Sequence, residues 1–170
     1  ISGFRVGFQG SSGLYGIEPD LVAYGKIVGG GFPAACVGGK SVIMDALAPL
    51  GNVFQAGTLS GNPVAMSAGY AVLSELLHKN IYQELQEKSD FLFKDLEKDL
   101  QTTPHSLNRV GSMFSFFFEK KSPTNKKEVE ESNKDTFRSF FFHLLQEGIY
   151  FSPSFLESNF LSQSHTEKQL

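Results

Sequence analysis

The sequence predicts an α/β protein made of two differently composed zones. Residues 1 to about 72 hold most of the 17 glycines, whereas most of the 17 phenylalanines follow them. The first zone contains short apolar runs stopped by glycines and one long segment with helical periodicity. The second zone alternates amphipathic helical segments with a Phe-rich stretch typical of strands. We therefore expect short strands and helices in the first zone. In the second we expect an α+β arrangement with helices covering a small sheet.

Composition narrows the class of protein further. The chain has 170 residues, of which 41% are hydrophobic and 19% charged, which favours a packed core over disorder. The net charge of −3 is spread along the chain, so we expect neither a nucleic-acid partner nor an electrostatic membrane anchor. No apolar run approaches the roughly 18 residues that a membrane-spanning helix needs. Cys36 is the only cysteine, which excludes an internal disulfide and favours a reducing, cytoplasmic compartment.

Three short elements are expected early in the chain. The apolar run 21–23 predicts a short strand that ends near Lys26. Residues 34–40 predict a second strand, stopped by two glycines. Residues 41–49 predict a short helix that Ser41 caps.

A stronger helix is predicted over residues 61–79. Asn62 is a good N-cap, and Pro63 suits the first helical position. Apolar residues recur at helical spacing, and they are Val64, Ala68, Ala71, Val72 and Leu76. Many of the side chains are small, which indicates tight packing of this helix against another element.

The second zone begins with an amphipathic helix over about 80–101. Residues 109–120 then predict a strand pair or one bent strand. The highly charged stretch 119–135 predicts a solvated surface loop.

A third helix is expected over about 136–147, with Asp135 as its cap and phenylalanines facing inward. Gly148 suits the end of this helix, and 149–154 predicts a short strand.

Lys26 is the first candidate for chemistry, because it stands in an apolar stretch followed by three glycines at 29–31. Burial lowers the pKa of a lysine by disfavouring its charged form, and a neutral amine can attack a carbonyl to form a Schiff base. The alternative is a lysine that extends from a strand end to solvent. The glycines match neither dinucleotide-binding nor P-loop patterns. This stretch alone leaves both interpretations open.

A second candidate lies at 55–63, just before the helix at 61–79. Its glycines and hydroxyls are Gly57, Thr58, Ser60 and Gly61. The first N–H groups of a helix lack helical partners and the helix dipole favours negative charge there, so the stretch predicts an anion site. An ordinary capped helix start is the alternative.

Glu157 is the third candidate, a carboxylate among apolar residues, with an exposed loop glutamate as the alternative. His143 and His165 have no partners at metal-ligand spacing, so we predict no metal site. We interpret Cys36 as a small core residue rather than a nucleophile.

Two long stretches together resemble a known family. They are GFRVGFQGSSGLYGIEPDLVAYGKIVGGGFPAACVGGKSVIMDALAP and GNVFQAGTLSGNPVAMSAGYAVL. They resemble the class III pyridoxal-phosphate-dependent aminotransferases, and the QAGTLSGNP block is most similar to the aminomutases of that family. The resemblance continues through VGSMFSFFF and FFHLLQEGIYFSPS, so it covers essentially the whole chain. It implies a partial PLP-dependent transferase fold of type I. Residues 1–73 would belong to the large α/β domain, and residues 74–170 would form the small C-terminal α+β domain.

The resemblance also implies roles for the candidate residues. Lys26 matches the lysine that binds the cofactor pyridoxal 5'-phosphate covalently. Thr58 matches the threonine that binds the phosphate of the partner subunit's cofactor across a homodimer, and Gly57 would lie in the same loop. Glu157 matches a carboxylate near the substrate, although FLESNF differs here from the family's AFEAGF.

The aminomutases that the chain resembles convert glutamate-1-semialdehyde to 5-aminolevulinate, a tetrapyrrole precursor. By this resemblance the chain corresponds to a C-terminal portion, without the acidic residue that pairs with the cofactor ring nitrogen and without an upstream phosphate loop. We would expect such a piece to be inactive alone. Two alternatives remain: an ordinary class III aminotransferase that moves an amino group between molecules, and a non-catalytic dimerisation or regulatory fragment.

Overall fold

The computed structural model describes residues 2–170, and its contacts divide the chain into two compact units. Unit 1 is Ile1–Tyr82 and unit 2 is Gln83–Leu170. Both mix helices with short strands, which confirms the predicted α/β class. The division of the family's domains at residue 73 stays a prediction.

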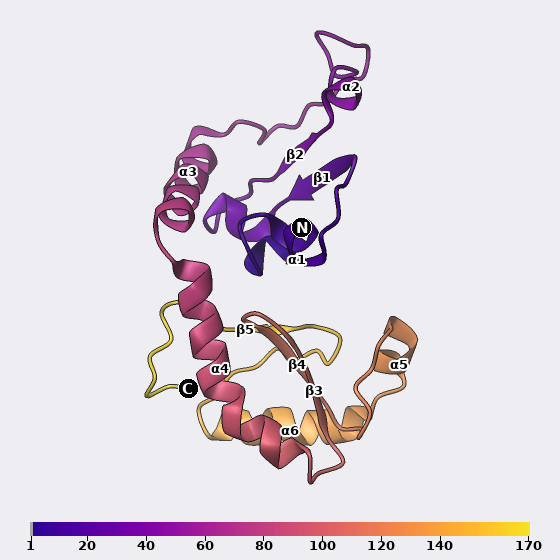
Figure 1. Cartoon of the computed structure of the whole chain (residues 1–170), viewed down its shortest axis with the longest axis vertical. Helices are drawn as coiled ribbons and strands as arrows, with labels where there is room; N and C mark the ends of the chain where they lie inside the picture. The colour runs from indigo at the N-terminus through magenta and orange to yellow at the C-terminus, as the bar shows by residue number, and fades with distance from the viewer. Residues whose placement is uncertain (1) are drawn as a thin grey trace. The chain divides into compact units, whose positions relative to one another are not determined.

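Unit 1 contains a two-stranded ribbon and a set of mostly short helices (Figure 1). Its elements are η1 (Ser2–Arg5), α1 (Gly10–Tyr15), β1 (Leu21–Tyr24), η2 (Lys26–Gly29), β2 (Cys36–Gly39), α2 (Ser41–Met44), α3 (Pro63–His78) and the first turn of α4 (Ile81–Leu100).

The ribbon pairs β1 with β2 in antiparallel register, from Leu21 opposite Gly39 to Tyr24 opposite Cys36. This confirms the two early strands, and it makes η2 part of the connection between them. Lys26 is the first residue after the short link that follows β1. The end of β1 in the ribbon therefore fixes the position of the backbone just before Lys26.

Both predicted helices after the ribbon are present, although α2 ends at Met44 and not at residue 49 as predicted. The side chain of Asn62 accepts the N–H groups of Val64 and Ala65, so it caps α3 as expected. The cap predicted for α2 was wrong, because Lys40 occupies the N-cap position and Ser41 is the first helical residue. The amide of Lys40 donates to the carbonyl of Asp20 and holds Lys40 in the extended ribbon, so α2 can begin only after it.

Phe4 is the main buried aromatic residue of unit 1, with 5% of its surface exposed. Its ring packs edge-on against Tyr24, with centroids 5.3 Å apart, and against Tyr82 at 6.4 Å. Val28 of η2, Ala65 of α3 and Ile81 of α4 are also buried, so the buried apolar residues of unit 1 lie on η1, η2, α3 and the start of α4.

Unit 2 is a three-stranded antiparallel sheet of order β3-β4-β5 with helices against it. Besides most of α4, its elements are β3 (Ser106–Val110), β4 (Met113–Phe117), α5 (Lys126–Glu130), α6 (Lys134–Gln146) and β5 (Asn159–Phe160). Strands β3 and β4 form a hairpin, and α5 lies beyond one end of it (Figure 1). The predicted strand pair is therefore present, but its first strand begins before residue 109.

The core of unit 2 is built around Phe93 of α4, Phe114 of β4 and Leu161. The rings of Phe93 and Phe114 meet edge to face, with centroids 4.9 Å apart. Phe140 of α6 packs against Phe116 of β4, with ring centroids 5.7 Å apart. The phenylalanines predicted to face inward from α6 thus include one that packs directly on β4.

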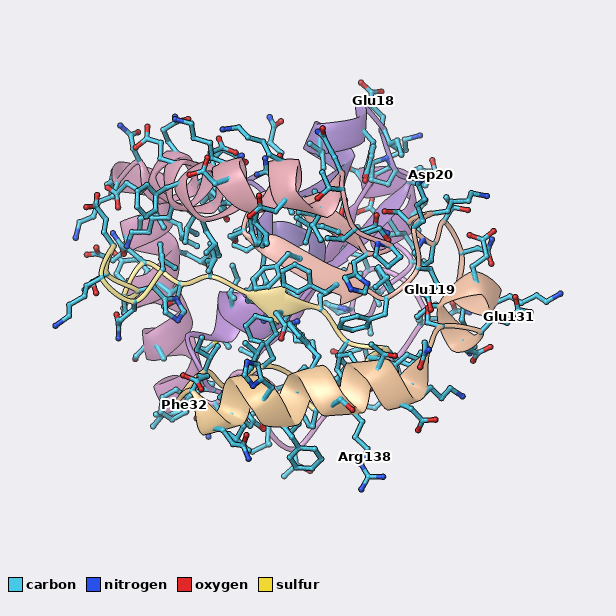
Figure 2. All side chains as sticks on the ribbon, turned by 90° about the horizontal axis from the view of Figure 1, so that it is seen from below. Glu18, Asp20, Phe32, Glu119, Glu131 and Arg138 are labelled. Carbon is cyan, nitrogen blue, oxygen red and sulfur yellow. The ribbon has the colours of Figure 1, made fainter. Side chains whose placement is uncertain are left out.

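The outer face of α6 is different. Arg138 projects from α6 away from the sheet (Figure 2). Its guanidinium carbon lies 5.9 Å from the ring centre of Phe142, which is half exposed. Helix α6 is therefore amphipathic, as its sequence predicted, with one exposed aromatic residue.

Three local predictions in unit 2 were wrong. The expected loop 119–135 contains α5, because Asn125 accepts the Glu128 N–H while the Glu128 carboxylate accepts the amide of Thr124, which forms a capping arrangement. Asn133, not Asp135, caps α6 by accepting the amide of Thr136.

The third concerns the strand expected at 149–154. Gly148 does follow the helix end with φ 81°, the left-handed conformation expected for glycine there. The amide of Ser152, however, donates to the side chain of Asn159 at 2.8 Å rather than to a neighbouring strand. The third strand of the sheet is β5, which lies further along the chain.

Candidate functional site

Lys26 opens η2 in an uncommon backbone conformation. Its φ is 61°, and it is the only non-glycine residue with positive φ within residues 2–170. Left-handed backbone at a residue with a side chain costs on the order of 1–3 kcal/mol, and such strain concentrates at functional sites. The conformation is therefore a second, independent reason to consider Lys26 functional.

The surroundings of Lys26 differ from the sequence expectation. The residue is exposed, whereas we expected a dry pocket. Its neighbours Gly25, Val28 and Gly29 are buried, so the backbone of the segment is packed while the amine reaches solvent. Residues 2–170 alone do not enclose the amine: Val28 is buried and Ile27 is half-buried, but Lys26 itself is exposed.

Gly57 and Thr58 lie in the exposed turns that precede α3. The amide of Ser60 donates a hydrogen bond to the carbonyl of Gly57 at 2.9 Å, and the amide of Asn62 donates one to the carbonyl of Leu59 at 3.1 Å. The Thr58 hydroxyl has no hydrogen-bond partner among residues 2–170. A free hydroxyl in the turn that leads into a 16-residue helix is suited to an anionic group.

The cap of α3 changes one detail of this anion site. Asn62 already accepts two of the first amide groups of the helix, those of Val64 and Ala65, at 3.1 and 3.2 Å. These amides are therefore not free for a ligand. Two amides of the preceding turn, those of Ser60 and Asn62, are also engaged with backbone carbonyls. The Thr58 hydroxyl is therefore the main donor left for an anion, rather than the helix N–H groups we expected.

Glu157 is exposed in the loop before β5. The Ser152 hydroxyl donates to its carboxylate at 3.1 Å, and its own amide donates to the Ser154 carbonyl at the same distance. The carboxylate is thus held by its own loop. Glu157 belongs to unit 2, whereas Lys26 and Thr58 belong to unit 1.

The remaining candidates have simpler roles. Cys36 is exposed on β2, so its interpretation as a core residue was wrong, since the two-stranded ribbon leaves that position uncovered. His165 accepts the amide of Ser162 at 2.9 Å, and His143 is exposed on α6. Within the described residues no three His, Cys, Asp or Glu side chains gather in a way that could hold a metal ion. None of the helices in residues 2–170 is long and apolar enough to cross a membrane.

One relationship was missed by the sequence reasoning. Gly69 of α3 lies against η2, the element that carries Lys26, and Gly30 lies against α3. The signal was available, because Ala65, Ala68 and Gly69 share one face of the helix that was predicted to pack tightly. What the sequence lacked was a reason to pair that face with the glycines at 29–31.

Comparison with known proteins places this arrangement in a family. Residues 5–158 match the family described as aminotransferase class-III. The chain belongs to this family. Its class III relatives include proteins named glutamate-1-semialdehyde 2,1-aminomutase from Akkermansia muciniphila, at 45% identity, and Chlamydia muridarum, at 46%. Both matches cover 100% of this chain but only 40% and 41% of the relative, so the chain spans about two fifths of their length.

Solved structures of transaminases and an aminomutase share the fold. An omega-transaminase from Sphaerobacter thermophilus matches with a TM-score of 0.83 at 25% identity, over 98% of this chain and 39% of that one. A glutamate-1-semialdehyde-aminomutase from Pseudomonas aeruginosa matches with a TM-score of 0.82 at 23% identity, over 98% of this chain and 40% of its own. The structural matches confirm the predicted partial transferase fold, and the family match and the relatives confirm the predicted family.

Proposed function

We propose that the chain is part of an aminomutase that converts glutamate-1-semialdehyde to 5-aminolevulinate. The reaction is an isomerisation in which one amino group changes carbon atoms, so no external amino donor is consumed. Support comes from the names of relatives that are 41–46% identical over the whole chain. The observation that carries the chemistry is Lys26, an accessible amine on a strained and otherwise buried backbone segment.

We propose pyridoxal 5'-phosphate as the cofactor, because the residues present suit its two reactive ends. The amine of Lys26 would hold its aldehyde carbon. The free hydroxyl of Thr58 and the turn that begins at Gly57 would hold a phosphate. When bound, pyridoxal phosphate supplies an electron sink for carbanion chemistry. By resemblance, Thr58 serves the cofactor of a second subunit, and so the proposal includes a homodimer.

Lys26 has a second role in this proposal. Once its Nζ atom no longer holds the cofactor, that nitrogen would move protons between the substrate carbons and the cofactor. Such transfer needs a neutral amine, and burial favours the neutral form of a lysine. The enclosure that residues 2–170 do not supply around Lys26 would then come from other parts of the assembled protein.

Glu157 is proposed as a substrate contact, by resemblance alone. Its carboxylate already accepts the Ser152 hydroxyl, which would keep its orientation fixed. The cytoplasmic compartment suggested by the single cysteine also stays a prediction.

The direct test uses the full-length protein loaded with pyridoxal phosphate. Glutamate-1-semialdehyde supplied without any amino donor should give 5-aminolevulinate over many turnovers. Borohydride reduction should leave one pyridoxyl group on the peptide that contains Lys26, and Lys26→Ala should lose both results. The variant Lys40→Ala is a matched control, since Lys40 is an exposed lysine paired with Asp20 away from η2.

Other outcomes would point to the alternatives. Turnover that requires an added amino donor would identify an ordinary aminotransferase. A full-length protein that neither turns over nor acquires a pyridoxyl group would identify a non-catalytic chain. Labelling that survives in Lys26→Ala would contradict the assignment of Lys26 itself.

A further inference from the structure

We propose that Gly69 and Gly30 are positioning residues for Lys26. They allow the backbone of α3 to lie directly on η2, and this contact sets where the lysine amine is presented. The inference rests on the proposed function, since it concerns the placement of the same lysine. Nothing in the family assignment requires these two glycines to have this role.

The contact is made between backbones from both sides. A Cβ atom built on Gly69 would lie 2.8 Å from the carbonyl oxygen of Val28 in η2. A Cβ atom built on Gly30 would lie 2.7 Å from the carbonyl oxygen of Ala68 in α3. Both distances are shorter than real Cβ contacts, and both neighbours are backbone atoms that cannot rotate away. Only glycine therefore fits at either position without a displacement of η2 or α3.

The surroundings of the contact leave little room for adjustment. Ala65, one turn before Gly69, has 1% of its surface exposed, and Val28 has 8%. Gly29 and Gly69 are buried as well. Because packed interiors respond to one added methyl group, the strain of a substitution would be passed on rather than absorbed.

Lys26 is tied to this contact by the shortness of η2. The element is a single turn, Lys26–Gly29, and it ends at Gly30, whose φ is 58°. Val28 is two residues from Lys26 within that turn, so a displacement of the Val28 carbonyl shifts the lysine too. The strained φ of 61° at Lys26 limits how the backbone can compensate.

Helix chemistry makes Gly69 unusual in its own element. Glycine is a much poorer helix former than alanine in a helix interior, and α3 places alanine at three neighbouring positions. The close contact with Val28 provides a physical reason for glycine at residue 69. A substitution of Gly69 by alanine should stabilise the helix while it displaces η2 from its contact with α3. An effect on Lys26 can therefore be distinguished from a loss of helix stability.

The experiment compares Gly69→Ala with Ala71→Ser in the full-length protein. Ala71 is exposed on the same helix, and Ala71→Ser also adds one heavy atom. Apoprotein is mixed with pyridoxal phosphate, and the rate of attachment to Lys26 is followed by absorbance and borohydride trapping across pH. Thermal unfolding midpoints are recorded for each variant.

We expect Gly69→Ala to fold and to attach pyridoxal phosphate about 10- to 100-fold more slowly, since misplacing a reactive group by ~1 Å costs about 100-fold. The control should remain within about twofold of the parent. Gly30→Ala, which disturbs the other side of the same contact, should be slowed as well. If Gly69→Ala attaches at the parental rate, or if both glycine variants unfold, the positioning proposal is overturned.

A double-mutant cycle separates a misplaced lysine from general damage. Turnover of Lys26→Ala supported by added methylamine should be the same with and without Gly69→Ala, because the group that was misplaced is no longer there. An equal loss in both backgrounds would indicate a structural role only. A parent protein that attaches no pyridoxal phosphate would overturn the proposed function first. A parent that attaches it, together with a Gly69→Ala variant that attaches it at the same rate, would overturn only this inference.

Discussion

The phenol of Tyr82 donates a 2.8 Å hydrogen bond to the backbone carbonyl of Phe4, 78 residues away in the sequence. The two rings also pack edge to face. Burial raises the pKa of Tyr82 to about 12. This contact joins Tyr82, the last residue of unit 1, to η1 within the unit that carries Lys26.

The raised pKa predicts how stability depends on alkaline pH. An unfolded tyrosine has a pKa of about 10, so the contribution of neutral Tyr82 is complete below about pH 10 and is lost as pH rises toward 12. Tyr82→Phe should lower the free energy of unfolding by about 1 kcal/mol at pH 7 through the lost hydrogen bond. Denaturant unfolding of parent and variant from pH 7 to 11 measures this. A difference that does not shrink above pH 10 would contradict the assignment.

In unit 2, Arg109 joins two acidic residues of α4 to the sheet. Its guanidinium donates to Asp90 at 2.7 Å and to Glu97 at 2.7 Å. The hydrogen bond from Arg109 lowers the pKa of Asp90, so the pair stabilises the fold above the ordinary carboxyl pKa of about 4 and loses that effect as pH falls below it. Asp90→Asn should cost less than about 1 kcal/mol at pH 7, because Asp90 is half exposed.

Urea unfolding from pH 2 to 7 tests this prediction. The parent and Asp90→Asn should converge at the acid end of the range. Arg109→Lys provides the matched comparison, since it keeps the positive charge but loses the forked donor geometry that reaches both carboxylates. If Asp90→Asn lowers stability equally at pH 2 and pH 7, the ion pair is not the source of the effect.

Asn62 is expected to connect helix stability with cofactor binding. Its side chain caps α3, and the turn that holds Thr58 immediately precedes it. Asn62→Ala should destabilise the protein by about 1 kcal/mol and should also weaken binding of pyridoxal phosphate, because the turn loses its anchor. Asn62→Asp keeps the cap and is the control. Binding that is unchanged in a measurably destabilised Asn62→Ala would show that the turn is independent of the cap.

Local signals explain which elements could be predicted from the sequence. Asn62 followed by Pro63 marks the start of α3, and the structure places the cap and the helix there. The high charge of residues 119–135 predicted a loop, whereas the capping pair of Asn125 and Glu128 in the same stretch marks the start of α5. Both helix starts carry a capping signal within a few residues, but the charged composition around α5 is also typical of a loop.

The properties of the candidate site depended on contacts that no local pattern contains. The apolar residues around Lys26 suggested that its amine is buried, yet Lys26 is exposed although Val28 is buried. The pairing of Gly69 with Val28 joins segments 41 residues apart, and only the folded backbone brings them together. The roles of Lys26 and Thr58 stay predictions from residue type and resemblance, whereas their surroundings required the structure.

Thr58 is expected to recognise phosphate through its free hydroxyl. Thr58→Val keeps the shape but removes the donor, and losing one hydrogen bond to a charged group should weaken pyridoxal phosphate binding by about tenfold or more. Thr58→Ser should remain close to the parent. Pyridoxal, which lacks the phosphate, is the ligand control, and titration of each variant with both ligands measures the effect. Equal weakening of both ligands would rule out a phosphate contact.

Co-expression of two variants can decide whether Thr58 serves its own subunit or the other one. A hybrid dimer of one Lys26→Ala subunit and one Thr58→Val subunit has two possible outcomes. If Thr58 acts across the dimer, the site with the intact lysine also receives the intact threonine, and the hybrid regains one fully competent site. If Thr58 acts within its own subunit, every site keeps one defect. Separately tagged subunits allow the hybrid to be purified, and its affinity for pyridoxal phosphate at the intact Lys26 then distinguishes the two arrangements. Parental affinity at that site is the result expected from the homodimer proposed here.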